Sequence, residues 1–162
     1  MRFDPDALLA ALPKREIKPL PAGIRVSPSK LREVRSGSVL GDEGEYNGFT
    51  SKERSRTAAV SNWLAAVGAT ERPPVCDICG RPGKHEHAEN YYDLCSWVGI
   101  CVRCHTNLLH KRLANDGRWQ SWLGTCELPC DHWSRLVSPQ PFDLAGLLRA
   151  RGAHEPLRQD FA

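Results

Sequence analysis

The organisation of this chain rests on residues 75–112, which read VCDICGRPGKHEHAENYYDLCSWVGICVRCHTNLLHKR. The stretch contains two CxxC pairs separated by 21 residues, formed by Cys76, Cys79, Cys101 and Cys104. Each pair can turn two thiolates towards one point, and two pairs supply the tetrahedral sulfur shell of a structural zinc ion. Gly80, directly after the first pair, fits the tight turn of a zinc knuckle. The spacing therefore predicts one four-cysteine zinc site that organises the middle of the chain.

The surrounding sequence favours metal binding over disulfide formation for the 7 cysteines of this chain of 162 residues. The apolar run at residues 7–12 is short and follows Asp4 and Asp6, whereas a secretory signal has a basic flank. We therefore expect a cytoplasmic, reducing compartment, where closely spaced cysteines are more often metal ligands. No stretch approaches the roughly 18 apolar residues of a membrane span, so no membrane association is expected.

Three helices are predicted around the metal segment. Asp4 and Pro5 open a short helix that runs to Leu12, and a longer helix covers residues 51–67. The longer helix has a capping box in which Thr50 pairs with Glu53, and its expected buried stripe is Val60, Trp63, Leu64 and Val67. Asp143 caps a last helix that ends near Arg151.

Other segments carry weaker indications. A further short helix is expected at residues 29–35, and residues 115–117 (Asn-Asp-Gly) are interpreted as a turn. Trp119 and Trp122 are interpreted as core packing against the metal segment.

We predict an α+β fold in two parts. Residues 1–49 form a basic, proline-rich arm with a glycine-rich acidic loop, and residues 50–162 form one domain with flanking helices.

The charge distribution leans weakly towards a nucleic-acid partner. The formal net charge is only +3, but residues 1–35 hold eight Lys/Arg against four Asp/Glu. Lys52, Arg54 and Arg56 crowd the first turns of the helix at residues 51–67, against the sign that the helix dipole prefers. A docked phosphate would remove that mismatch. The alternative is that these cations form an ordinary solvated face.

Two segments carry a family resemblance: HEHAENY at residues 85–91 and CVRCHTNLLHKR at residues 101–112. Over residues 75–112 the chain resembles the zinc-stapled members of the HNH nuclease family. In that family a CxxC pair precedes a strand bearing a histidine followed by acidic and tyrosine residues, and a second CxxC pair runs into a helix with two histidines. The resemblance implies a ββα-metal, treble-clef type core, in which two strands and a helix hold one catalytic divalent ion.

The resemblance also implies roles for individual residues. His87 would be the general base, Asn90 would orient the site, and His105 and His110 would bind Mg²⁺, Mn²⁺ or another divalent ion. The implied function is a metal-dependent endonuclease that hydrolyses the phosphodiester bonds of double-stranded DNA. The expected phosphate contacts are the basic arm at residues 14–35 together with Lys52, Arg54, Arg56, Arg103, Lys111 and Arg112.

The sequence departs from the family pattern in two places. Many relatives carry two adjacent histidines on the strand, but here Ala88 follows His87, so His87 would cover both roles or His85 would help. His105 and His110 are five residues apart, which on a regular α-helix offsets them by about 140°. Only a π-bulge, or a helix that begins after His105, would bring these two side chains to one ion.

These departures from the family pattern leave alternatives to a nuclease. A non-catalytic zinc module of the same fold, binding nucleic acid or a protein, is the main rival, and a structural assembly protein is a third possibility. Cys126, Cys130 and His132 are spaced as three ligands of a second zinc ion. The competing interpretation is that these residues are ordinary side chains in a compact tail.

Overall fold

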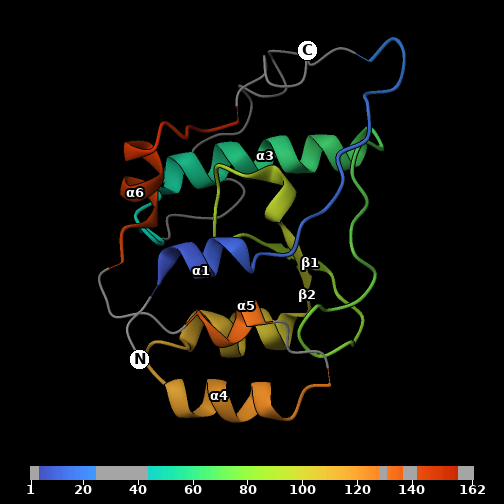
Figure 1. Cartoon of the computed structure of the whole chain (residues 1–162). Coiled ribbons are helices and arrows are strands. Elements are labelled where there is room, and N and C mark those ends of the chain that lie inside the picture. Colours follow the sequence, from blue (N-terminus) through green and yellow to red (C-terminus); the bar gives the residue numbers. More distant parts are fainter. Residues whose placement is uncertain (1–3, 25–43, 128–130, 137–141, 157–162) are drawn as a thin grey trace. The chain divides into compact units, whose positions relative to one another are not determined.

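The computed structural model describes residues 4–24, 44–127, 131–136 and 142–156 (Figure 1). The predicted helix at residues 29–35, most of the glycine-rich loop and Cys130 lie outside these residues. The elements, in chain order, are α1 (Pro5–Ala10), α3 (Ser51–Ala66), β1 (His85–His87), the 3₁₀ turn η1 (Leu94–Ser96), β2 (Val98–Ile100), the π-helix η2 (Arg103–Leu108), the 3₁₀ turn η3 (Leu109–Lys111), α4 (Asp116–Gly124), α5 (Asp131–Ser134) and α6 (Leu144–Ala150). The predicted mixture of helices and strands is confirmed.

The chain forms two compact units whose segments alternate along the sequence. The metal unit comprises Met1–Lys14, Arg72–Ala88 and Ser96–Gln140, and the helical unit comprises Arg15–Glu71, Glu89–Cys95 and Pro141–Ala162. The predicted boundary at residue 49 stays a prediction, because much of the preceding arm lies outside the described residues. Within the part of the chain that is described, no helix combines the length and apolar composition needed to cross a membrane.

A short antiparallel hairpin forms the centre of the metal unit. β1 pairs with β2 in the register His85 with Ile100, Glu86 with Gly99 and His87 with Val98. Side chains alternate across a strand, so His85 and His87 share one face of β1. The second CxxC pair follows β2 directly and leads into η2. The hairpin therefore delivers histidines from one strand and cysteines from the end of the other.

The first CxxC pair is attached to β2 by two reciprocal hydrogen bonds. The Asp77 amide donates to the Gly99 carbonyl, and the Gly99 amide donates to the Asp77 carboxylate, each at 2.9 Å. The knuckle turns at Gly80, whose φ of 70° is unfavourable for other residues and whose amide donates to the Cys76 carbonyl at 2.9 Å. The predicted glycine turn is confirmed. These hydrogen bonds hold the knuckle against β2 independently of any metal ion.

Gly99 is also required for close packing in this unit. A Cβ atom at this position would lie 2.4 Å from Pro73 Cβ and 3.0 Å from the Val75 carbonyl oxygen. We expect Gly99→Ala to lower the free energy of unfolding of the metal unit by about 1–3 kcal/mol, since the strand must move away from the knuckle. Chemical denaturation measures this. Gly124→Ala is the control, because a Cβ there meets nothing within 4 Å. Equal denaturation midpoints for Gly99→Ala and the control would contradict the packing argument.

The core of the metal unit is built from buried aromatic and aliphatic side chains. Its fully buried members include Leu8, Ile78, Ile100, Leu109, Trp119, Trp133 and Leu136. Leu8 comes from α1, whose N-terminus is capped by Asp4 as predicted. The predicted turn at residues 115–117 is wrong. Asn115 accepts a hydrogen bond from the Arg118 amide at 3.1 Å, and so the chain enters α4 at once.

The helical unit is organised by α3, which has the predicted capping box. The Glu53 amide donates to Thr50 Oγ1 at 3.2 Å, and the Thr50 amide donates to Glu53 Oε2 at 2.8 Å. The expected buried stripe is only partly right, since Trp63 and Val67 are half-buried. The buried face of α3 instead consists mainly of small side chains and includes Arg54, Ser55, Thr57, Ala58, Ala59, Val60, Ser61 and Leu64.

Glu53 also connects α3 to other parts of this unit. Its carboxylate accepts a hydrogen bond from the Tyr92 hydroxyl, and Arg149 of α6 lies 3.3 Å from the same carboxylate oxygen. Arg149 also donates to the Tyr92 hydroxyl at 3.0 Å. The predicted last helix is confirmed as α6. Asp143 caps it, because its carboxylate accepts a hydrogen bond from the Gly146 amide. A single glutamate thus serves a helix cap and a tertiary contact.

The charge on Glu53 should make this unit sensitive to acid. Burial raises the pKa of this carboxyl, but hydrogen bonds from Tyr92 and Thr50 outweigh burial and hold the pKa below its usual value of 4.5. The stabilisation is therefore fully present above that value and is lost as the pH falls through the lowered pKa. We expect Glu53→Gln to destabilise the unit by about 1–2 kcal/mol near pH 7 and by less in acid. Urea denaturation at several pH values tests this. Glu71→Gln, at an exposed ion pair with Lys18, should have little effect at any pH.

Candidate metal centres

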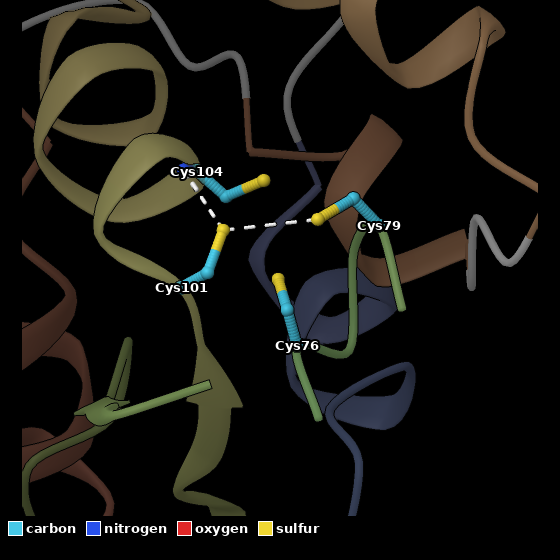
Figure 2. Close-up of side chains that lie close together, drawn as sticks. All are labelled: Cys76, Cys79, Cys101 and Cys104. Carbon is cyan, nitrogen blue, oxygen red and sulfur yellow. Dashed lines mark hydrogen bonds between the residues drawn. The ribbon is translucent and has the colours of Figure 1, made fainter. Parts of the chain in front are cut away.

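The four predicted cysteine ligands meet in the metal unit. Their sulfur atoms all lie within 4.8 Å of one another, and Figure 2 shows them turned towards a common point. The sulfurs of Cys79 and Cys101 are 3.7 Å apart. A tetrahedron of zinc–sulfur bonds of ~2.3 Å has edges of about 3.8 Å. The predicted four-cysteine cluster is thus confirmed, and its dimensions fit zinc.

The cluster stabilises the thiolate of Cys76, whereas the pKa values of Cys79 and Cys104 are raised. A hydrogen bond from Cys104 lowers the pKa of the Cys76 thiol to about 4, whereas the same interaction raises the pKa of Cys104. The Cys104 amide in turn donates to the sulfur of Cys101 at 3.5 Å. Three of the four sulfur ligands belong to buried residues, and only Cys79 is half-buried. Negative charge gathered in such a site is best balanced by a bound cation, which fits a structural zinc ion.

A second group of metal-binding side chains lies in the same unit. His87, His105 and His110, here called the histidine trio, each offer one ring nitrogen, and these atoms also lie within 4.8 Å of one another. Their ring centroids are 5.1 Å apart for His87 and His105 and 4.4 Å apart for His105 and His110. β1, η2 and η3 each contribute one member. The structure therefore brings together the strand histidine and both helix histidines.

The π-helix η2 explains how histidines five residues apart can meet. The Leu109 amide donates to two carbonyls, that of His105 four residues earlier and that of Cys104 five residues earlier. A regular α-helix has only the first of these hydrogen bonds. This wider turn brings residues separated by five to the same side of the helix. It is one of the two arrangements that the sequence required for His105 and His110 to converge.

His85 contacts the trio from the outside. Its Nδ1 lies 3.0 Å from Nδ1 of His105, while Nε2 of His105 lies 3.2 Å from Nδ1 of His87. The latter distance is close to the edge of about 3.4 Å expected between two nitrogens that share a tetrahedral ion at 2.0–2.1 Å. His105 therefore directs one ring nitrogen to His85 and the other to His87.

Asn90 has a local structural contact within the helical unit. Its side-chain carbonyl accepts a hydrogen bond from the Tyr92 amide at 2.9 Å, which forms an Asx-turn after β1. The neighbouring Glu89 is buried and accepts hydrogen bonds from the Tyr46 hydroxyl and the Asn47 amide group, both at 2.7 Å. The role of Asn90 in orienting a site stays a prediction.

Two of the predicted phosphate contacts, Arg54 and Arg112, have buried side chains. Arg54 is 6% exposed, lies over the ring of Tyr46 at 5.6 Å and donates to the Gly44 carbonyl at 3.0 Å. Arg112 is 2% exposed and donates to the carbonyls of Leu136 and Leu109 at 2.9 and 3.0 Å. Both guanidinium groups serve the interior of their units.

The other predicted cations are exposed, with different surroundings. Arg56 forms a two-point ion pair with Glu155, and Arg103 lies over the ring of Trp122. Lys52 and Lys111 are exposed. In the basic arm, Arg15 donates to the Leu94 carbonyl and to Ser61 Oγ, both at 2.8 Å, so it attaches the chain to the helical unit.

The alternative of a second zinc site at Cys126, Cys130 and His132 stays untested, because Cys130 lies outside the described residues. Apart from the four cysteines and the trio, the described part of the chain has no group of three or more possible metal ligands. The Cys126 thiol donates to the Trp122 carbonyl at 3.3 Å, and His132 is buried with its ring 4.9 Å from that of Trp133. Both described residues are used in packing.

No protein-family model matches the chain, and no solved structure matches it. Two curated proteins are similar over 90 residues at 30% identity: PDZ and LIM domain protein 1 from Homo sapiens and from Bos taurus. The similarity covers 50% of this chain but only 24% of each relative. LIM domains are zinc modules, so the similarity agrees with zinc binding by the four cysteines.

Proposed function

We propose that this protein is a metal-dependent endonuclease of the HNH type that hydrolyses phosphodiester bonds in DNA. The observation that supports this proposal is the convergence of three imidazoles next to a four-cysteine cluster, on a hairpin followed by a helix. A purely structural zinc module needs the cysteines but has no use for three additional ligands. The three histidines also differ in exposure: His87 is buried, His105 is half-buried and His110 is exposed. The site thus opens on one side, as catalytic metal sites do.

The trio fits a divalent ion that prefers nitrogen ligands. Imidazoles suit Zn²⁺ and Ni²⁺, whereas Mg²⁺ and Mn²⁺ prefer oxygen ligands. The three nitrogen ligands therefore favour an ion such as Zn²⁺ or Ni²⁺ over Mg²⁺ or Mn²⁺. A bound ion of this kind would polarise the scissile phosphate and lower the pKa of a water molecule. The chain contributes the three nitrogens and the open side at His110.

In this proposal His87 is a ligand instead of the general base that the resemblance implied. Its Nδ1 lies 3.2 Å from His105 Nε2, within the spacing of one coordination shell. His85 orients His105, since a hydrogen bond between their Nδ1 atoms leaves Nε2 of His105 for the ion. Lys111 is exposed directly after His110 and can contact a substrate phosphate.

A plasmid-nicking assay with Zn²⁺, Ni²⁺, Mn²⁺ and Mg²⁺ added separately tests this function. We expect nicking with at least one nitrogen-preferring ion and the weakest nicking with Mg²⁺. His87→Ala should lose both the second ion and cleavage if it is a ligand, whereas loss of cleavage with the ion retained would identify a base. His154→Ala, an exposed histidine of the helical unit, is the matched control. Absence of nicking with all four ions would refute the proposal.

A non-catalytic zinc module that binds nucleic acid is the second candidate. Two observations favour it: Ala88 occupies the place of the second strand histidine, and the similarity to LIM-domain proteins concerns zinc binding alone. A salt-dependent mobility shift of labelled DNA without cleavage would support this candidate. Absence of any shift would point to a protein partner.

A further inference from the structure

Trp122 makes a contact that packing alone does not require. It lies on α4 and is half-buried, in contrast to the fully buried Trp119 on the same helix. Its indole N–H donates a hydrogen bond to the sulfur of Cys104 at 3.3 Å. Cys104 is fully buried within η2, so the indole approaches a zinc ligand that solvent does not reach.

The charge of the site gives this hydrogen bond its importance. Four thiolates around one Zn²⁺ carry a net charge of −2, and N–H groups that donate to the sulfurs disperse that charge. Hydrogen bonds to charged acceptors are stronger than those between neutral groups. A donor to this buried sulfur therefore reduces the negative charge that Cys104 presents to the bound ion and to other reagents.

Arg103 supports the same ring. Its guanidinium carbon lies 4.2 Å from the ring centroid of Trp122, which is within cation–π distance. The guanidinium of Arg103 therefore lies over the same ring whose N–H donates to the sulfur of Cys104. Positive charge over the ring face also makes the indole N–H a better donor.

Trp122 also borders the accessible side of the four-cysteine site. A cavity of about 470 Å³ is lined by Cys79, Trp122 and Cys126, among others. Cys79 is the half-buried ligand of the cluster, so this cavity is where a chelator or an electrophile reaches the sulfurs. Trp122 lies in its wall with its N–H already occupied by Cys104.

We propose that Trp122 is a positioning residue of the four-cysteine site: its indole N–H lowers the reactivity of the Cys104 thiolate, and Arg103 holds the ring in place. This inference depends on the four-cysteine zinc site and not on nuclease activity. It also links zinc binding to α4, because the hydrogen bond to Cys104 joins the helix to the ligand shell.

Trp122→Phe tests the proposal, since phenylalanine keeps an aromatic face for Arg103 but has no N–H. We expect the zinc affinity of the variant, measured by competition with a chelator, to be about tenfold or more below that of the wild type. In the Co²⁺-loaded protein, the thiolate-to-metal charge-transfer bands should move to lower energy while the ligand-field bands stay tetrahedral. Trp63→Phe, at a half-buried position on α3, should leave both readouts unchanged.

A second replacement separates the N–H group from the shape of the ring. β-(3-Benzothienyl)alanine at position 122 has the same bicyclic outline as tryptophan but cannot donate a hydrogen bond. The proposal requires this isostere to shift the charge-transfer energy as Trp122→Phe does. Wild-type zinc retention and wild-type band energies in the isostere would overturn the proposal, because packing would then account for any effect of phenylalanine.

Discussion

Cys104→Ser should release the bound zinc and unfold the metal unit. This cysteine is fully buried among the other three sulfurs, and serine cannot replace a thiolate as a zinc ligand. The free energy of binding a structural zinc ion is about 10–16 kcal/mol in small zinc modules and is largely folding free energy. We therefore expect loss of stoichiometric zinc and loss of dispersed amide NMR signals from β1, β2 and η2.

Cys126→Ser is the matched control for this experiment. Cys126 is a half-buried cysteine of the same unit but is not a member of the four-sulfur group. It should retain zinc and native NMR dispersion. A folded Cys104→Ser protein that still holds one zinc ion per chain would contradict the assignment of the ligands.

His105→Ala should weaken metal binding by the proposed histidine site and leave the four-cysteine site intact. His105 is the central member of the trio, with its Nε2 next to His87 and its ring 4.4 Å from that of His110. Removing one of three ligands should weaken binding of the second ion by about a hundredfold or more, since loss of an outer-shell partner alone costs about 10–100-fold. If the proposed nuclease function holds, nicking should fall by about a thousandfold or more.

Two measurements check the His105→Ala prediction. Isothermal titration with Ni²⁺ reports the second site, and plasmid nicking reports activity. The variant should still contain one zinc ion and keep the hairpin signals of the wild type. Unchanged Ni²⁺ affinity would contradict the trio as a metal site, whereas lost affinity with unchanged nicking would contradict only the proposed mechanism.

The two sites should depend on each other in one direction. Cys104 and His105 are adjacent in η2, so the four-cysteine site holds the helix that leads to two members of the trio. Cys104→Ser should therefore remove both metal sites, but His105→Ala should remove one. The four-cysteine site is the structural requirement for any chemistry at the histidines.

Local patterns predicted much of the fold correctly. The CxxC spacing identified the four ligands, and the caps at Asp4, Thr50 and Asp143 identified the starts of α1, α3 and α6. These features depend on residues close in sequence, or on a ligand type with few alternatives. The helix start at Asp116 was missed because Asn115 can serve either a turn or a helix cap.

Features set by tertiary contacts could not be predicted from sequence. The sequence predicts Arg54 and Arg112 as phosphate contacts because it shows their charge, whereas their aromatic and carbonyl partners come from elsewhere in the fold. The π-helical turn between His105 and His110 has no sequence pattern of its own. Sequence assigns both Trp119 and Trp122 to the core, but only the three-dimensional structure shows that Trp122 donates to the sulfur of Cys104.

We expect the four sulfurs to hold one zinc ion and thereby to fix the hairpin to η2. X-ray absorption at the zinc edge of the His105→Ala protein tests it most directly, because the trio can then no longer contribute a second zinc environment. We predict a single shell of four sulfur atoms at about 2.3 Å. A shell containing nitrogen or oxygen, or purified protein without stoichiometric zinc, would contradict the account.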